Sequence, residues 1–233
     1  MKMHTILLQN VQLNDSLNNI PQQETLSIIE LITSVGTGGA IIMSTLGLLS
    51  IYAVYILFER YSAIKHASKE DEEFFNNIKE FVERKEISSA KSLCQETNNP
   101  ISRMIEKGVD RIEQPMTDIS AAIENQGKLE VYKMENNLAN LATIAGAAPM
   151  IGFLGTVIGM IVAFHEMASS GGNINVEMLS KGIYTAMVTT VAGLVVGIIA
   201  YIAYNYLVSK VEKVIFKMEA RTTEFLDYLH HLE

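Results

Sequence analysis

No Asp, Glu, Lys or Arg interrupts Leu31–Phe58, which reads LITSVGTGGAIIMSTLGLLSIYAVYILF. Two further charge-free stretches, each 28 or 29 residues long like the first, lie at Asn136–Phe164 and Gly182–Ser209. A helix needs roughly 20 apolar residues to cross a bilayer core, so each stretch can span a membrane even after its ends are trimmed. The sequence therefore predicts an all-α integral membrane protein with three transmembrane helices.

Composition and charge indicate a chain that is only partly in lipid. Of its 233 residues 48% are hydrophobic, and the mean hydropathy is +0.20, which is high for a soluble domain. Of the 18 Lys and Arg, 12 lie within 59–140 and four follow Val208. Basic residues mark the cytoplasmic side of short loops, so we expect the N-terminus outside and the C-terminus inside. The net charge of −8 gives no indication of nucleic-acid binding.

These features divide the chain into eight expected segments. The first half holds an extracytoplasmic tail, an interfacial amphipathic helix, a first transmembrane helix and a cytoplasmic helical loop, at 1–23, 24–39, 40–58 and 59–140. The second half holds a transmembrane helix, an extracytoplasmic loop, a transmembrane helix and a cytoplasmic C-terminal helix, at 141–164, 165–182, 183–207 and 208–233. The segment 24–39 is equally compatible with a plain extension of the first span.

Patterns outside the spans predict helices there too. An apolar stripe on one helical face is formed by Phe74, Ile78, Phe81 and Val82. Asn98-Asn99-Pro100 predicts a break between two short helices, because the residue before a proline disfavours the helical region. A helix that starts near Pro115 could run into the second span. The C-terminal helix carries a coiled-coil-like seam, which could pack on 119–132, at Val211, Ile215, Met218, Thr222, Phe225 and Leu229.

Enzymatic and metal-binding constellations are missing from the sequence. None of the five histidines lies within 67–164, so no catalytic residue, metal ligand set or cofactor is predicted. His165 and Glu166 are adjacent at the outer end of the second span, where interfacial capping is favoured over proton or metal binding. The single cysteine, Cys94, is interpreted as a small buried side chain.

Small residues distinguish the second and third spans from ordinary lipid-facing helices. Glycines that let helix backbones approach closely occur at Gly152, Gly155, Gly159, Gly193 and Gly197. Pro149 removes a backbone donor inside the second span and frees a carbonyl near these glycines. A freed carbonyl needs a partner in lipid, so we expect this face to be buried in an assembly.

Hydroxyl residues share this crowded region. Thr156 follows Gly155 directly, and Thr189 and Thr190 lie one turn before Gly193, while Thr143 and Thr185 lie on the same two spans. Such hydroxyls can line a hydrated path across the membrane. They can equally bond back to the preceding helical turn and do nothing further. Both interpretations stay open at this stage.

Two motifs resemble the ExbB/TolQ branch of the MotA/TolQ/ExbB proton-channel family. Ala148–Met160, APMIGFLGTVIGM, is similar to the family's second-span signature, and Gly182–Leu194, GIYTAMVTTVAGL, to its third-span motif. Glu59-Arg60 resembles the family's sequence at the point where the chain leaves the first span. The resemblance covers nearly the whole chain after the N-terminal tail. It implies that Thr156 and Thr190 line a proton path, with Thr189 as a neighbouring candidate. Several ExbB proteins carry a glutamate at the position of Thr185.

The resemblance also implies an assembly and a function. A pentamer of this chain in the bacterial inner membrane would surround two copies of a single-span ExbD- or TolR-like partner, and would contact a TonB-like protein. It would couple the proton-motive force to TonB-dependent transport. The alternative is a TolQ-like subunit that energises the Tol system. Because the three spans hold no ionisable residue of the kind that proton relays use, we expect a partner carboxylate to bind the proton. A structural scaffold and, less favoured, a membrane enzyme are the rival classes.

Overall fold

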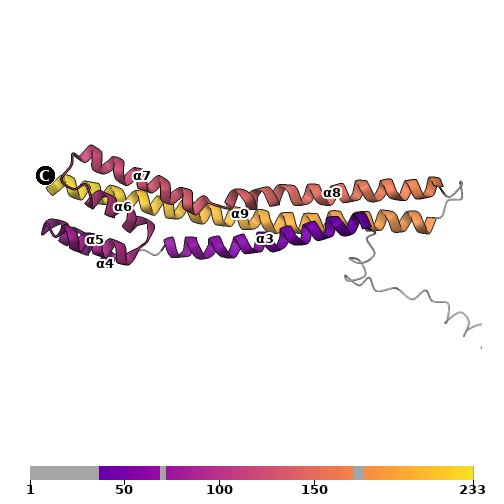
Figure 1. Ribbon diagram of the computed structural model, residues 1–233, viewed down its shortest axis with the longest axis horizontal. Coiled ribbons are helices and arrows are strands. Elements are labelled where there is room, and N and C mark those ends of the chain that lie inside the picture. Colours follow the sequence, from indigo (N-terminus) through magenta and orange to yellow (C-terminus); the bar gives the residue numbers. More distant parts are fainter. Residues whose placement is uncertain (1–36, 69–71, 170–175, 233) are drawn as a thin grey trace, which may run out of the picture.

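The computed structural model describes residues 37–68, 72–169 and 176–232, and every regular element within them is an α-helix. The expected tail at 1–23 and most of the expected interfacial helix at 24–39 lie outside these ranges. Three long helices, α3 (Thr37–Ala67), α8 (Leu138–Ser169) and α9 (Val176–Leu232), run side by side along the long axis (Figure 1). Each includes a segment long and apolar enough to cross a membrane. The predicted all-α, three-span fold is confirmed.

The long helices extend beyond the predicted span boundaries. α8 continues to Ser169 and the next helix begins at Val176, so both ends of the expected loop at 165–182 are helical. α9 then continues without a break to Leu232, and α8 and α9 reach past the start of α3 (Figure 1). These lengths give the second and third spans a continuous contact along their whole apolar portion.

Four shorter helices gather at the end of the molecule that holds the C-terminus (Figure 1). They are α4 (Glu72–Glu83), α5 (Ile87–Thr97), α6 (Pro100–Val109) and α7 (Met116–Glu135). The predicted break between α5 and α6 is confirmed, because Asn98 adopts a left-handed conformation and Asn99 caps α6. The Ser102 amide donates to Asn99 Oδ1 over 2.7 Å, and the Asn99 amide donates to Ser102 Oγ over 2.9 Å. This reciprocal capping box satisfies amides that the helix start leaves free.

The C-terminal seam of α9 packs against this helical end. Val211, Met218, Phe225 and Leu229 are buried as predicted, whereas Val214 is more deeply buried than Ile215. The seam meets α6 closely, since a Cβ built on Gly108 would lie 3.0 Å from the Phe225 ring. The third span is therefore continuous with the core of the helical end.

The expected continuous helix from Pro115 into the second span is interrupted at Asn136 and Asn137. Asn137 has a φ of 64°, a left-handed conformation that asparagine tolerates better than most residues and that ends α7. Its side-chain amide donates to Glu59 Oε2 over 3.2 Å. Arg60 Nη1 donates to the Lys133 carbonyl over 3.0 Å, in the last turn of α7, where carbonyls lack partners within the helix. The Glu59-Arg60 pair of α3 thus stabilises the break between α7 and α8.

Candidate functional site

The backbones of α8 and α9 meet most closely at Gly152 and Gly193. A Cβ built on Gly193 would lie 2.6 Å from the Ala148 carbonyl oxygen and 2.8 Å from Gly152 Cα. A Cβ on Gly152 would lie 2.7 Å from the Thr189 carbonyl oxygen. Real Cβ atoms essentially never come within 3.0 Å of such neighbours. Both positions therefore need glycine for the two helices to pack as they do.

The remaining glycines predicted to serve packing lie along the same interface. A Cβ on Gly155 would meet the Thr189 side chain, and one on Gly159 would lie 2.8 Å from Ala186 Cβ. Gly197 faces Pro149, whose Cγ would lie 2.5 Å from its Cβ. The small residues thus form one continuous contact between the second and third spans.

Pro149 lies inside α8, and the helix continues through it. Proline lacks the amide that would bond the carbonyl four residues earlier, which is that of Ala145. The Ala145 carbonyl oxygen would lie 3.1 Å from a Cβ on Gly197. The carbonyl that proline frees therefore faces α9 and not the lipid-exposed side of α8.

The threonine hydroxyls join the two helices at this contact. Thr156 Oγ1 donates to the Ala186 carbonyl over 3.2 Å and is hydrogen-bonded to the Thr190 hydroxyl. Thr190 Oγ1 donates to the Gly152 carbonyl over 3.1 Å. Each hydroxyl carries a single proton, so the two protons are shared among three contacts. Rotation of both hydroxyls together therefore reverses the direction of the hydrogen-bonded chain.

Thr189 lies beside this pair but differs from it in exposure. Its side chain is only 1% exposed, and Oγ1 contacts the Ala186 carbonyl at 2.7 Å and the Gly152 carbonyl at 3.2 Å. Thr156 and Thr190 are half-buried instead. The pair formed by Thr156 and Thr190 is thus open to a further group or to water, whereas Thr189 is enclosed by backbone.

The other two threonines bond within their own helices. Thr143 Oγ1 donates to the Ala139 carbonyl over 2.8 Å and is exposed, and Thr185 Oγ1 donates to the Gly182 carbonyl over 3.0 Å. These are the local bonds that transmembrane threonines commonly make. The structure brings Thr156, Thr189 and Thr190 together and leaves Thr143 and Thr185 apart from them.

Tyr184, for which the sequence predicts no role, adds a buried polar group on α9. Its hydroxyl oxygen is buried and has no hydrogen-bond partner among the described residues. A buried tyrosine hydroxyl ordinarily finds one. The available signal was its position next to Thr185 in the third-span motif, where a tyrosine resembles an ordinary interfacial aromatic residue. A water molecule or a group from another chain would satisfy it.

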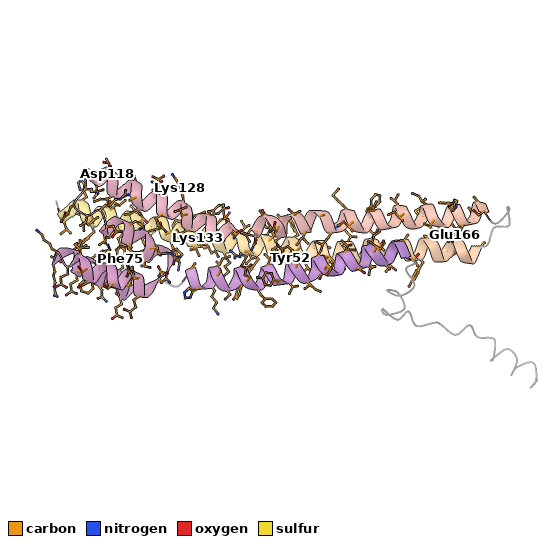
Figure 2. All side chains as sticks on the ribbon, in the orientation of Figure 1. Tyr52, Phe75, Asp118, Lys128, Lys133 and Glu166 are labelled. Carbon is orange, nitrogen blue, oxygen red and sulfur yellow. The ribbon has the colours of Figure 1, made fainter. Side chains whose placement is uncertain are left out.

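The candidate metal ligands and the single cysteine lie apart from the threonine pair. The residues that the structure describes contain no group of three or more His, Cys, Asp and Glu side chains that could hold a metal ion. His165 and Glu166 are exposed, and Figure 2 shows Glu166 at the opposite end of the molecule from Asp118 and Lys128. Cys94 is fully buried, and burial raises the pKa of its thiol to about 12. The predicted burial of Cys94 is confirmed.

The threonine pair and its glycines fall in a region that matches a known family. A model of the MotA/TolQ/ExbB proton channel family matches residues 96–220. The chain belongs to this family. The matched region runs from the end of α5 through both threonine-bearing spans and into the buried seam of α9.

Similar proteins place this family member in the ExbB/TolQ branch. A putative biopolymer transport protein ExbB homologue of Methanothermobacter thermautotrophicus is 27% identical over 78% of this chain and 64% of its own length. The biopolymer transport protein ExbB of Aquifex aeolicus is 34% identical over 47% of this chain and 74% of its own. The Tol-Pal system protein TolQ of Pseudomonas aeruginosa is 24% identical over 88% of this chain and 93% of its own.

Proposed function

We propose that this chain is the stator subunit of a proton-driven complex, which couples the proton-motive force to TonB-dependent transport across the outer membrane. The observation that carries the proposal is the hydroxyl chain of Thr156 and Thr190, which bridges two helices inside charge-free spans. Around it, closely packed glycines exclude lipid from the contact between α8 and α9. A lipid anchor would need neither feature.

The titrating group of this complex belongs to a partner. Proton relays through membranes use ionisable side chains, and the charge-free stretches contain no Asp, Glu, Lys or Arg. A carboxylate from a single-span ExbD-like partner would bind the proton, while Thr156 and Thr190 donate to or accept from it. Thr185, at the place of the glutamate in several ExbB proteins, bonds to the Gly182 carbonyl, which supports a pathway without a carboxylate of this chain's own.

The proposed assembly is a pentamer in the bacterial inner membrane, with the N-terminus periplasmic and the C-terminus cytoplasmic. Two partner helices lie inside the ring and face the half-buried threonine pair. The energy released by proton movement drives a TonB-like protein. Moving one charge through 100 mV releases about 2.3 kcal/mol, so several protons per cycle can drive rearrangement of the partner. The 16 basic residues within 59–140 and after Val208 support this orientation.

A TolQ-like role in the Tol system is the second candidate function. It is favoured by the alignment with the Pseudomonas aeruginosa TolQ, which covers 93% of that protein. The two roles share the membrane chemistry and differ in the partner that they serve. Co-purification from cells that carry both ExbD-like and TolR-like single-span proteins distinguishes them: the ExbD-like protein is expected to be retained.

The experiment that tests proton coupling uses vesicles that contain this chain alone, or this chain with its single-span partner. We expect rapid proton flux only when both are present, and loss of flux when the partner's membrane carboxylate is changed to the corresponding amide. Replacing sodium with choline should leave the flux unchanged if the ion is a proton. Rapid, specific proton flux from this chain alone would contradict the assignment of the titrating group to the partner. Complete assembly without any flux would favour a structural scaffold.

A further inference from the structure

A basic cleft lies between α3 and α9, just beyond the apolar spans. It has a volume of about 390 Å³ and is lined by four lysines from the two helices, together with Tyr61, Ile64, Ser68 and Leu207. Lys65 comes from α3, while Lys210, Lys213 and Lys217 come from α9. The volume falls within the range of about 300–1,000 Å³ that is typical of small-molecule sites.

The lysines of this cleft carry like charges at neighbouring positions. Lys210, Lys213 and Lys217 share one face of α9, because residues three and four apart in a helix are neighbours. Among the residues that the structure describes, no acidic side chain lines the cleft, and Lys65, Lys210 and Lys213 form no ion pair. Like charges at this spacing destabilise a helix. An anion in the cleft would turn this repulsion into attraction.

The cleft lies at the depth of lipid headgroups. The charge-free stretches end at Phe58 and Ser209, so Lys210 is the first cation after the third span. Lys65 follows Phe58 by seven residues, a rise of about 10 Å along the helix, and its long side chain can extend back toward the headgroups. Tyr61 and Tyr206 stack with centroids 6.4 Å apart, as aromatic residues at a membrane interface often do, and Lys210 lies over the Tyr206 ring at 5.4 Å.

Apolar surface suited to acyl chains continues from the cleft along the spans. Phe58 on α3 is 69% exposed, and Ile202, on the same face of α9 as the lysines, is 62% exposed. A phosphate-bearing headgroup held by the lysines would therefore place its acyl chains against exposed apolar side chains. A soluble anion has no acyl chains to place against these exposed apolar side chains.

We propose that the cleft between α3 and α9 binds the headgroup of an anionic phospholipid, with Lys65, Lys210 and Lys213 contacting its phosphate. The lipid bridges the first and third spans at the point where α3 ends and the chain leaves the membrane for the short helices. Lys217 lies at the end of the cleft that is farther from the spans. This binding is independent of the proposed proton coupling, because it involves neither the threonine pair nor the partner carboxylate.

The test compares two triple variants of the full chain, purified as the oligomer that it forms. One is Lys65→Gln, Lys210→Gln and Lys213→Gln; the control, Lys85→Gln, Lys107→Gln and Lys128→Gln, has the same change in charge on exposed lysines of the helical end. Native mass spectrometry then measures affinity for phosphatidylglycerol and for phosphatidylcholine. Basic residues near an anionic surface each contribute roughly fivefold in affinity, so the cleft variant should lose at least about tenfold for phosphatidylglycerol.

Two further arms separate the lipid from other anions and from unspecific charge. Phosphatidylglycerol should raise the unfolding temperature of the wild-type and control proteins but not that of the cleft variant, and phosphatidylcholine should raise none of them. Inorganic phosphate or glycerophosphoglycerol that protects as well as the lipid would overturn the lipid assignment in favour of a soluble anion. Equal phosphatidylglycerol affinity of the two triple variants would show that the cleft is not the site.

Discussion

Replacing Gly193 by alanine would force α8 and α9 apart at their closest contact. The added Cβ would lie 2.6 Å from the Ala148 carbonyl oxygen, about 0.8 Å short of ordinary van der Waals contact at 3.4 Å. Overpacking of this kind typically costs about 1–3 kcal/mol. Because the three nearest atoms are all backbone atoms of Ala148 and Gly152, no side-chain rotation relieves the clash. A separation of this size would also stretch the hydrogen bond of 3.1 Å from Thr190 to the Gly152 carbonyl beyond hydrogen-bonding distance.

The assay is equilibrium unfolding in mixed detergent micelles, with Gly146→Ala as the matched control. Gly146 lies on α8, the helix that Gly193 of α9 contacts, but a Cβ there meets nothing within 4 Å. Alanine has the higher helix propensity by roughly 0.5–1 kcal/mol, so Gly146→Ala should be neutral or stabilising. Gly193→Ala should lower the free energy of unfolding by about 1–3 kcal/mol relative to wild type. Indistinguishable stabilities of the two variants would refute the close backbone contact.

Three further outcomes are expected in the helical end. Glu130→Gln should destabilise the helical end by about 1–3 kcal/mol, because the buried Glu130 carboxylate accepts a hydrogen bond from Arg103 over 2.6 Å. A urea titration followed by circular dichroism measures this loss of stability. An unchanged midpoint would contradict the prediction. Asn99→Ala should cost about 1 kcal/mol by removing the cap on the Ser102 amide, whereas Asn99→Asp should retain most of it. Cys94 should resist alkylation at pH 8 until the protein unfolds, because its thiol pKa of about 12 leaves almost no thiolate; fast labelling of folded protein would show that the site is open.

Local sequence rules predicted much of the fold because each relevant signal lies within a few residues. The missing charges located the three spans, and the Asn98-Asn99-Pro100 sequence located a helix break that the capping of Ser102 explains. The glycine spacing located the closely packed faces, since only glycine lets two backbones approach to this distance.

Features that depend on contacts between distant segments were not predictable. The break at Asn137 lies inside a charge-free stretch, and its stabilising bonds come from Glu59 and Arg60 on another helix. Glu130 belongs to a region rich in acidic residues, where a solvated surface was the natural expectation, yet its side chain is 2% exposed. Neither position carries a local pattern that distinguishes it from its neighbours.

The roles of the threonines depend on the geometry of the helix contact and not on local sequence. Thr143 and Thr156 lie on the same span and are equivalent by composition, but Thr143 bonds to its own helix and Thr156 to α9. The choice depends on which face of α8 meets α9, and that is fixed by packing over the whole interface. Tyr184 escaped notice for the same reason, because burial of its hydroxyl depends on neighbours far away in the sequence.

Proton flux through vesicles that hold this chain with its partner tests the central claim most directly. Thr156→Val and Thr190→Val remove the hydroxyls at nearly constant volume, and Thr143→Val removes one that bonds only within α8. If a hydrogen bond that lowers the transport barrier by about 1.4 kcal/mol is lost, flux falls about tenfold. At equal assembly, we expect this fall for Thr156→Val and Thr190→Val, partial recovery for Thr190→Ser and wild-type flux for Thr143→Val. Wild-type flux in Thr156→Val and Thr190→Val would contradict the proposed pathway.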